Sequence, residues 1–371
     1  MSANTPRHSP GDWEQAAAQL LSRTAHDLPT GRHHHHKERL MTAIEHAGQP
    51  HTAPAAPAAP AARARTRRLR RPAIVLPALA AAAAAAVLAA TATVGGGPGH
   101  RAALATGPAL TTRIGAASPQ GVTQLLDQAS LVAAPDSHPA LAPGQYVYIE
   151  SRTADTFVKT VNGRSSLASH ALHERQVWYS ADGTKGWLID PAVNDSPEGE
   201  TLSLPDEQGN TPVAGLNHPS YDLLAKLPAD PDALLATIYE QTRGHGNSPD
   251  QEAFTTIGDL LGESYPPPAL TKALFKAAGK IPGVVAVDDA VDAVGRHGTA
   301  VARLDETSGQ REEWIFDTTT HVFLGKRTVQ VGRATGPEEL IAPGTVLFTS
   351  AVTQRAVVND IKQVPQQNHP S

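Results

Sequence analysis

The stretch TAVARLDETSGQREEWIFDTTTHVFLGKRTVQVG, residues 299–332, decides how the second half of this sequence folds. It reads as three successive strands, separated by turn residues at Thr307-Ser308-Gly309 and at Thr318 to His321. Because successive side chains of a strand point to opposite faces, Glu312 and Glu313 cannot work together as an acid–base pair. The stretch therefore predicts consecutive strands and no paired catalytic carboxylates within them.

Further strand signals lie on both sides of this stretch. Residues 144–153, GQYVYIESRT, alternate between two faces as a half-buried strand does. Residues 172–190 read as two strands around Asp182-Gly183, which is a strong hairpin signal. Residues 344–360 add another strand or a pair of strands.

A block of helices is predicted between the strands. Four segments place apolar residues at helical spacing: 220–228, 230–242, 251–263 and 267–281. Strands, then helices, then strands again indicate an α+β domain over residues 140–365, with a curved antiparallel sheet and helices packed on one side. This order resembles the half-barrel of bacterial lipoprotein carriers and of periplasmic regulators of sigma-factor pathways, and the resemblance is one of fold alone.

Six aromatic residues of this domain are candidates for a ligand groove. The concave face of such a half-barrel can take an acyl chain, so these side chains can line it. The alternative is that they form the hydrophobic core, in which aromatic residues contribute much of the stability. The six are Tyr146, Tyr148, Trp178, Trp187, Trp314 and Phe316.

A predicted membrane anchor precedes the domain. No Asp, Glu, Lys or Arg occurs from residue 72 to residue 100, and a bilayer core needs about 20 apolar residues in a helix. We expect a transmembrane helix over residues 72–96. A signal peptide and a soluble Ala-rich helix or linker are the alternatives. A signal peptide has only a short segment before its apolar run, whereas roughly 70 residues precede the apolar run here.

An arginine cluster beside the anchor predicts its orientation. Positive charge stays on the cytoplasmic side, so the N-terminus is expected inside and the residues beyond about 100 outside. The protein is thus expected in the cell membrane, with contact between the arginines and anionic lipid favoured over a nucleic-acid partner. The cluster comprises Arg63, Arg65, Arg67, Arg68, Arg70 and Arg71.

The remaining segments are short. Residues 1–48 predict a small helical cytoplasmic head, residues 49–71 a Pro/Ala linker with the basic segment, and residues 97–139 an extracytoplasmic tether with one short helix around Val122 to Leu131. Residues 1–71 carry a net charge of +6 and the rest of the chain −11, which suggests two environments. The four histidines His33 to His36 are interpreted as the polar start of a helix. A purification tag and a zinc site are the weaker alternatives.

The order of these segments resembles that of a known family. HDLPTGRHHHHKERLMTAI at 26–44, the linker, the arginines, one membrane helix and PGQYVYIES at 143–151 are similar to an uncharacterised actinobacterial family of single-pass membrane proteins. That family is organised like anti-sigma factors, so the resemblance implies that the head binds a sigma factor. The zinc-binding motif His-x3-Cys-x2-Cys of many anti-sigma factors is absent, because the chain has no cysteine.

The sequence contains no recognised catalytic motif. His218, Ser220 and Asp222 lie close together, but Ser220 is interpreted as a helix cap. The cluster Asp288, Asp289, Asp292 and His297 lacks the spacing of a calcium loop. We therefore expect no enzyme, no cofactor and no metal site.

The sequence thus favours a binding protein. The main expectation is envelope signalling as an anti-sigma-like regulator or its accessory. The alternative is an extracytoplasmic protein that binds a lipid or another hydrophobic ligand.

Overall fold

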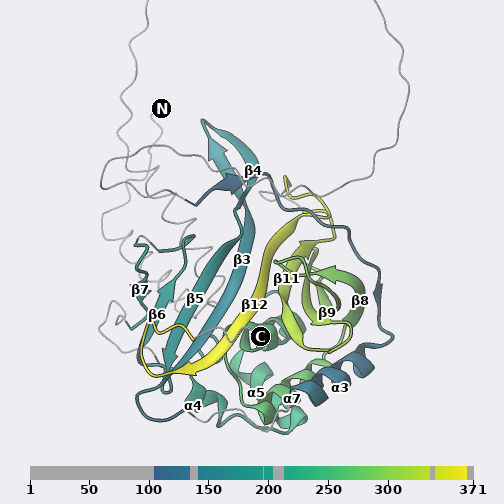
Figure 1. The fold of residues 1–371 in the computed structure, drawn as a ribbon. Helices are drawn as coiled ribbons and strands as arrows, with labels where there is room; N and C mark the ends of the chain where they lie inside the picture. Colours follow the sequence, from purple (N-terminus) through teal and green to yellow (C-terminus); the bar gives the residue numbers. More distant parts are fainter. Residues whose placement is uncertain (1–103, 134–140, 195, 204–212, 335–338, 366–371) are drawn as a thin grey trace, which may run out of the picture. The chain divides into compact units, whose positions relative to one another are not determined.

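The computed structural model describes residues 104–133, 141–194, 196–203, 213–334 and 339–365 (Figure 1). The predicted head, linker, basic segment and transmembrane helix, together with His33 to His36, lie outside these residues. In the part that is described, no helix has the length and apolar character needed to cross a membrane.

The described strands form one antiparallel sheet of 12 strands, in the order β2-β8-β9-β10-β11-β12-β3-β5-β6-β7, with β4 paired to β3 and β1 paired to β4. Figure 1 shows the strand direction changing across the sheet, from the long β3 and β5 to β8 and β9. The strands are β1 Thr106–Gly107, β2 Ala117–Ser118, β3 Tyr146–Val161, β4 Arg164–His170, β5 His173–Ser180, β6 Gly186–Ile189, β7 Glu200–Thr201, β8 Val284–Val291, β9 His297–Asp305, β10 Gln310–Asp317, β11 Phe323–Gln330 and β12 Val346–Val358.

The predicted strands are confirmed. Strands β9, β10 and β11 are the three successive strands of residues 299–332, and each pairs with the next. Strands β5 and β6 pair across the Asp182-Gly183 turn, where Gly183 has a φ of 76°. Residues 344–360 contain the single long strand β12.

The helices are α3 Val122–Val132, α4 Tyr221–Leu224, α5 Pro231–Gln241, α6 Pro249–Glu263 and α7 Pro268–Ala278. The sequence marks their starts. Asp230 accepts hydrogen bonds from the backbone N–H groups of residues 232 and 233, and Ser248 accepts one from that of residue 251. Proline follows each of these caps at the first helical position, where its missing N–H costs least.

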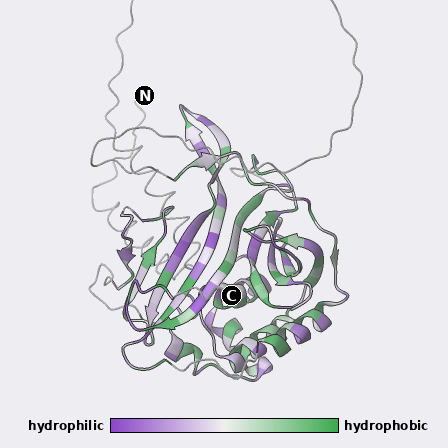
Figure 2. Ribbon diagram, viewed as in Figure 1, coloured by the Kyte–Doolittle hydropathy of each residue, from purple (hydrophilic) through white to green (hydrophobic). Residues whose placement is uncertain are grey.

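The main core lies between these helices and one face of the sheet. Helix α7 lies between α3 and α5 (Figure 1), and all three pack with α6 into one buried apolar cluster. Figure 2 shows apolar and polar residues alternating along α3 and α7, as expected of helices with one buried face. The sheet contributes Val301, Trp314 and Phe316 to this cluster. The expected α+β architecture, an antiparallel sheet with helices packed on one side, is therefore present.

Residues 104–133 belong to the folded unit, although the sequence analysis places them in a tether. Val122, Leu126 and Ala129 of α3 are buried in the main core. Strands β1 and β2 extend the sheet by pairing with β4 and β8. The helix itself is where the sequence predicts it, but its apolar face packs on the domain, so the fold includes residues from 104 onward.

The sheet face opposite to the main core holds a buried charge cluster. Glu313 is fully buried and pairs with Arg311 and Arg327, each at 2.7 Å. The two arginines also donate to the N-terminal segment, Arg311 to the carbonyl of Gly115 and Arg327 to the hydroxyl of Thr112. This cluster fastens residues 112–115 to the sheet.

Candidate functional site

The structure divides the six aromatic candidates between two clusters. Trp314 and Phe316 lie in the main core, against the helices. Tyr148 and Trp178 form a separate cluster, against which Tyr146 and Trp187 pack. Tyr148, Trp178, Trp314 and Phe316 are completely buried. The six side chains thus do not gather around one groove, and their burial agrees with the core alternative.

The Tyr148 cluster is closed by hydrogen bonds. The Tyr148 hydroxyl donates to the Glu150 carboxylate at 2.7 Å and accepts from the Gln176 amide at 3.0 Å. Burial, together with the Glu150 carboxylate, raises the pKa of Tyr148 far above its usual range. The indole N–H of Trp178 donates to the carbonyl of Gln363, in the C-terminal segment. These polar groups have partners within the protein, which is the pattern of a structural cluster.

Trp314 is equally enclosed. Its ring stacks on Phe254 of α6, with ring centroids 3.9 Å apart and an angle of 9° between the planes. Phe316 contacts Phe275 of α7 and Phe323 of β11 edge-on. These contacts join the helices to the sheet.

An apolar hollow opens at the edge of this core, where the end of α3, the start of α7, the β10–β11 turn and β12 meet. Its volume is about 290 Å³, and its lining is mostly apolar. We call it the Arg355 hollow. Its lining includes Val132, Ala133, Leu261, Phe275, Phe323 and Arg355.

Arg355 has unusual electrostatic surroundings. Its Nη2 donates to the carbonyl of Leu261, while its Nε is buried without a hydrogen-bond partner. Burial lowers the pKa of Arg355 to about 10, and only the neighbouring Tyr265 hydroxyl opposes that shift. Every other buried or half-buried arginine in the described ranges has a carboxylate within 4.0 Å. These arginines are Arg152, Arg175, Arg303, Arg311 and Arg327.

A pair of carboxylates on α6 faces a lysine close to the hollow. Asp259 contacts the Lys326 ammonium of β11, and Glu263 lies 3.6 Å from it. Burial raises the pKa of Asp259 to about 7, against the effect of Lys326. Although burial disfavours the charged ammonium, these carboxylates raise the pKa of Lys326, which therefore stays charged. Lys326 has two counter-ions on α6, whereas Arg355 has none.

His173, Thr153 and Asp190 have the residue types of a catalytic triad but not its geometry. Both Thr153 Oγ1 and Asp190 Oδ1 lie against the same ring nitrogen, Nε2, at 3.0 and 3.1 Å. The other nitrogen, Nδ1, donates to the carbonyl of Ala171 at 2.9 Å. A triad needs the nucleophile and the carboxylate on opposite nitrogens of the base. The arrangement instead suits a buried ion pair.

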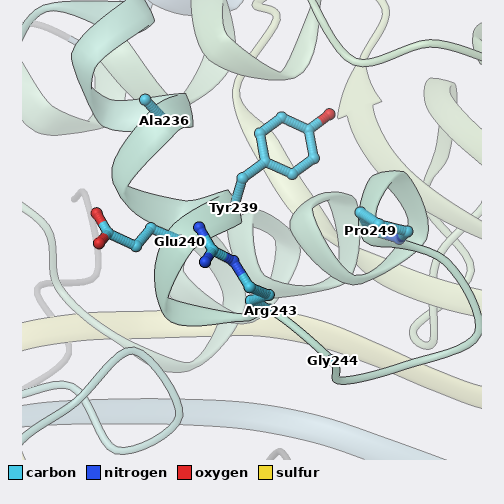
Figure 3. Close-up of a pocket in the computed structure, with 6 residues that line it drawn as sticks. All are labelled: Ala236, Tyr239, Glu240, Arg243, Gly244 and Pro249. Atoms are coloured by element: carbon cyan, nitrogen blue, oxygen red, sulfur yellow. The ribbon is translucent and has the colours of Figure 1, made fainter.

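A second hollow lies between α5 and the start of α6 (Figure 3), with a volume of about 490 Å³. Figure 3 shows the side chains of Tyr239 and Glu240 pointing in different directions, so polar groups do not converge on one point. The Tyr239 hydroxyl donates to Asp250 at 2.7 Å, and burial together with this bond raises its pKa. Glu240 and Arg243 are exposed. This hollow is a surface depression without the features of a binding site.

The other candidate groups have structural roles. Ser220 caps α4 by accepting a hydrogen bond from the backbone N–H of Leu223, as predicted. Asp292 binds the side chain and backbone of Arg296 across a turn. Within the described ranges, no group of three or more His, Cys, Asp or Glu side chains is placed to hold a metal ion.

Arg355 is not among the candidate residues that the sequence predicts. A signal for its orientation exists: Arg355 and Val357 alternate along β12, and their partners on β3, Ile149 and Val147, point to the same face. The sequence carries no signal for the burial of Arg355, because that depends on the end of α6, far away in the chain, lying over it.

Comparisons with known proteins add little to the evidence on the function of this chain. No model of a protein family matches this sequence, and no curated protein matches it. Among solved structures, the MucA/MucB complex of Pseudomonas aeruginosa contains a similar chain, with a TM-score of 0.23 and 13% sequence identity. The match covers 67% of this chain and 59% of that chain, so it spans less than two thirds of the length of that chain. A similarity at this TM-score carries no conclusion about fold or function.

Proposed function

We propose that this protein is a single-pass membrane protein of envelope signalling, with a ligand-binding outer domain and a cytoplasmic head that binds a sigma factor. In this proposal the outer domain is a half-barrel, and the chain as a whole is organised like an anti-sigma factor. The proposal joins two observations: the charge pattern around residues 72–96, and an outer domain with an accessible hollow.

The observation that carries the binding role is the Arg355 hollow. A mostly apolar cavity with a few polar groups is the usual form of a small-ligand site. Here one of the polar groups is the guanidinium of the half-buried Arg355, whose Nε is buried and has no hydrogen-bond partner among the described residues. A sensor domain needs such an unfilled site, whereas the two aromatic clusters are already closed.

The head provides the direct test of the signalling role. Residues 1–62, fused to an affinity tag, are expected to retain a sigma factor that mass spectrometry identifies. The same fusion with Leu20 and Leu21 changed to Asp is the control. These two residues lie at helical spacing with Trp13 and Ala17 and supply the apolar face of a helix predicted in the first part of the head. Recovery of no sigma factor, or equal recovery by the control, would reject the proposed head function.

The second candidate function is a lipid- or hydrophobic-ligand-binding envelope protein whose head has no regulatory partner. The Arg355 hollow favours it equally, since a carrier also needs an apolar cavity. The two candidates differ only in the head. A chain that binds a ligand in the hollow but retains no sigma factor belongs to this second class.

A further inference from the structure

We propose that the Arg355 hollow binds a single-chain amphiphile with an anionic head group, either a carboxylate or a phosphate monoester. This inference deepens the proposed function. It rests on one part of it, namely that the outer domain binds a ligand. It concerns the chemistry of one cavity and is independent of any partner of the head.

Arg355 has no carboxylate counter-ion among the described residues. Among the described residues that line the hollow, Arg355 is the only one with a permanent charge. Its Nε is buried and has no hydrogen-bond partner, while Nη2 binds only a backbone carbonyl. A buried charge without a partner is costly, and an anion in contact with it offsets that cost. Guanidinium groups match the geometry of carboxylate and phosphate oxygens.

The contrast with Lys326 shows that the fold does not leave buried cations unpaired as a rule. Lys326 lies on the same face of the sheet and is contacted by both Asp259 and Glu263. In the part of the chain that the structure describes, no aspartate or glutamate lines the hollow itself. The cavity is therefore positive, which disfavours cationic ligands and favours anions.

The lining and the mouth of the hollow are largely apolar. Leu261, Phe275 and Phe323 line the hollow, and Val132 and Val322 are exposed at 42% and 45%. Large apolar side chains that remain exposed around a cavity provide surface for an apolar ligand to cover. An alkyl chain fits this lining, with its head group at Arg355.

The size of the hollow limits the kind of ligand that it can hold. A volume of about 290 Å³ is close to the lower limit of ordinary ligand cavities, which begin at about 300 Å³. The hollow therefore suits one chain rather than a lipid with two chains. Burial of each added methylene is expected to strengthen binding roughly fourfold until the chain fills the hollow.

The experiment uses the full chain in lipid nanodiscs and a dodecanoate probe that carries a photoreactive diazirine. After irradiation, mass spectrometry is expected to find the probe on peptides of α3, α7 and the β10–β11 turn. Free dodecanoate or dodecyl phosphate should displace it, and the more effective of the two identifies the head group. Equal displacement by dodecanol would overturn the role of the cation. Labelling elsewhere, or none, would overturn the site.

Two pairs of variants test the residues. Arg355→Gln should reduce labelling at least about tenfold, because a charged hydrogen-bond partner is lost. Arg152→Gln is the control and should leave labelling unchanged, because Arg152 pairs with Glu174 and does not line the hollow. Arg355→Gln also removes the hydrogen bond to the carbonyl of Leu261. A second pair of variants therefore tests the site without changing Arg355.

The second pair lies on α3. Val132→Trp should block the mouth and abolish labelling, while Leu131→Trp should leave it unchanged. Leu131 is 70% exposed and does not line the hollow. Unchanged labelling in Val132→Trp would overturn the site. A head that retains no sigma factor would leave these results as they stand, so the two proposals can fail separately.

Discussion

Neighbouring residues of this sheet can have opposite environments, and Glu312 and Glu313 show it most clearly. Glu313 lies between two arginines on one face. Glu312 faces α6, where it accepts hydrogen bonds from the hydroxyl of Thr255 and the indole of Trp314. The alternation of a strand predicts the opposite directions, and the structure confirms them. The alternation does not predict which of the two glutamates pairs with a cation.

Substitutions of the two glutamates can therefore measure how much the buried ion pairs of Glu313 stabilise the protein. Glu313→Gln should destabilise the protein by about 3–5 kcal/mol, because it leaves two buried guanidinium groups without an anion. Glu312→Gln should cost about 1 kcal/mol, since the amide oxygen can accept from the indole of Trp314 while the amide nitrogen donates to the hydroxyl of Thr255, which can also accept. Urea unfolding of the two variants measures both values. Equal losses would mean that the buried charge at Glu313 has no special weight.

His173 and Asp190 give the stability a pH dependence. Burial alone would lower the pKa of His173, but its hydrogen bond to Asp190 raises it above 6.5. The pKa of Asp190 is lowered: its bond to His173 and the Arg175 charge outweigh its burial. A raised histidine pKa stabilises the fold fully below pH 6.5, and this stabilisation disappears as the pH rises through the folded value. The aspartate contribution is present above its unfolded pKa of 3.8 and is lost as the pH falls through its lowered folded value.

We therefore expect the free energy of unfolding to fall as the pH rises above 6.5, and His173→Gln to remove this fall. His297→Gln is the matched control, because the side chain of His297 is 71% exposed and its partner Asp289 is exposed as well. The measurement is urea unfolding between pH 5.5 and 8.5. A wild-type profile that His173→Gln leaves unchanged would show that the His173–Asp190 pair does not set this dependence.

At the scale of elements, local signals predicted most of the fold. Caps such as Ser248 followed by Pro249 mark a helix start regardless of the rest of the chain, and α6 begins there. The hairpin between β3 and β4 was missed, although Asn162-Gly163 is a typical signal for its turn. Both residues have positive φ, 50° and 73°, as such a turn requires. Helix α3 was predicted, but helical spacing shows only that a face is apolar, not what it packs against.

The packing of α3 defines the smallest stable fragment. A fragment of residues 104–365 is expected to unfold cooperatively, because it contains the whole main core. A fragment of residues 140–365 lacks α3 and exposes the surface that Val122, Leu126 and Ala129 cover. It should be less stable by at least the roughly 2–5 kcal/mol expected for Leu126→Ala alone. Thermal unfolding of both fragments measures the difference. Equal stability would place α3 outside the cooperative unit.

At the scale of the whole molecule, the inclusion of residues 104–133 in the domain brings it closer to the predicted anchor. Only residues 97–103 separate the predicted span from the first described residue. Seven residues extend at most about 25 Å, so the domain is expected to lie close to the membrane surface. The same N-terminal segment supplies α3, which lines the Arg355 hollow. A ligand in the hollow would therefore touch the N-terminal part of the domain, which is the part that follows the predicted anchor in the sequence.

This arrangement depends on the orientation of the anchor, which the absence of cysteine makes easy to test. Each introduced cysteine is unique in the chain, so a membrane-impermeant maleimide on intact cells reports one position at a time. Gln120→Cys, at an exposed residue of the outer domain, should be labelled, and Gly48→Cys in the head should be labelled only after lysis. Changing all six arginines from Arg63 to Arg71 to Gln should make labelling at the two positions more nearly equal, because these charges hold the N-terminus inside. Labelling of Gly48→Cys before lysis, with Gln120→Cys protected, would reverse the orientation and place the Arg355 hollow in the cytoplasm.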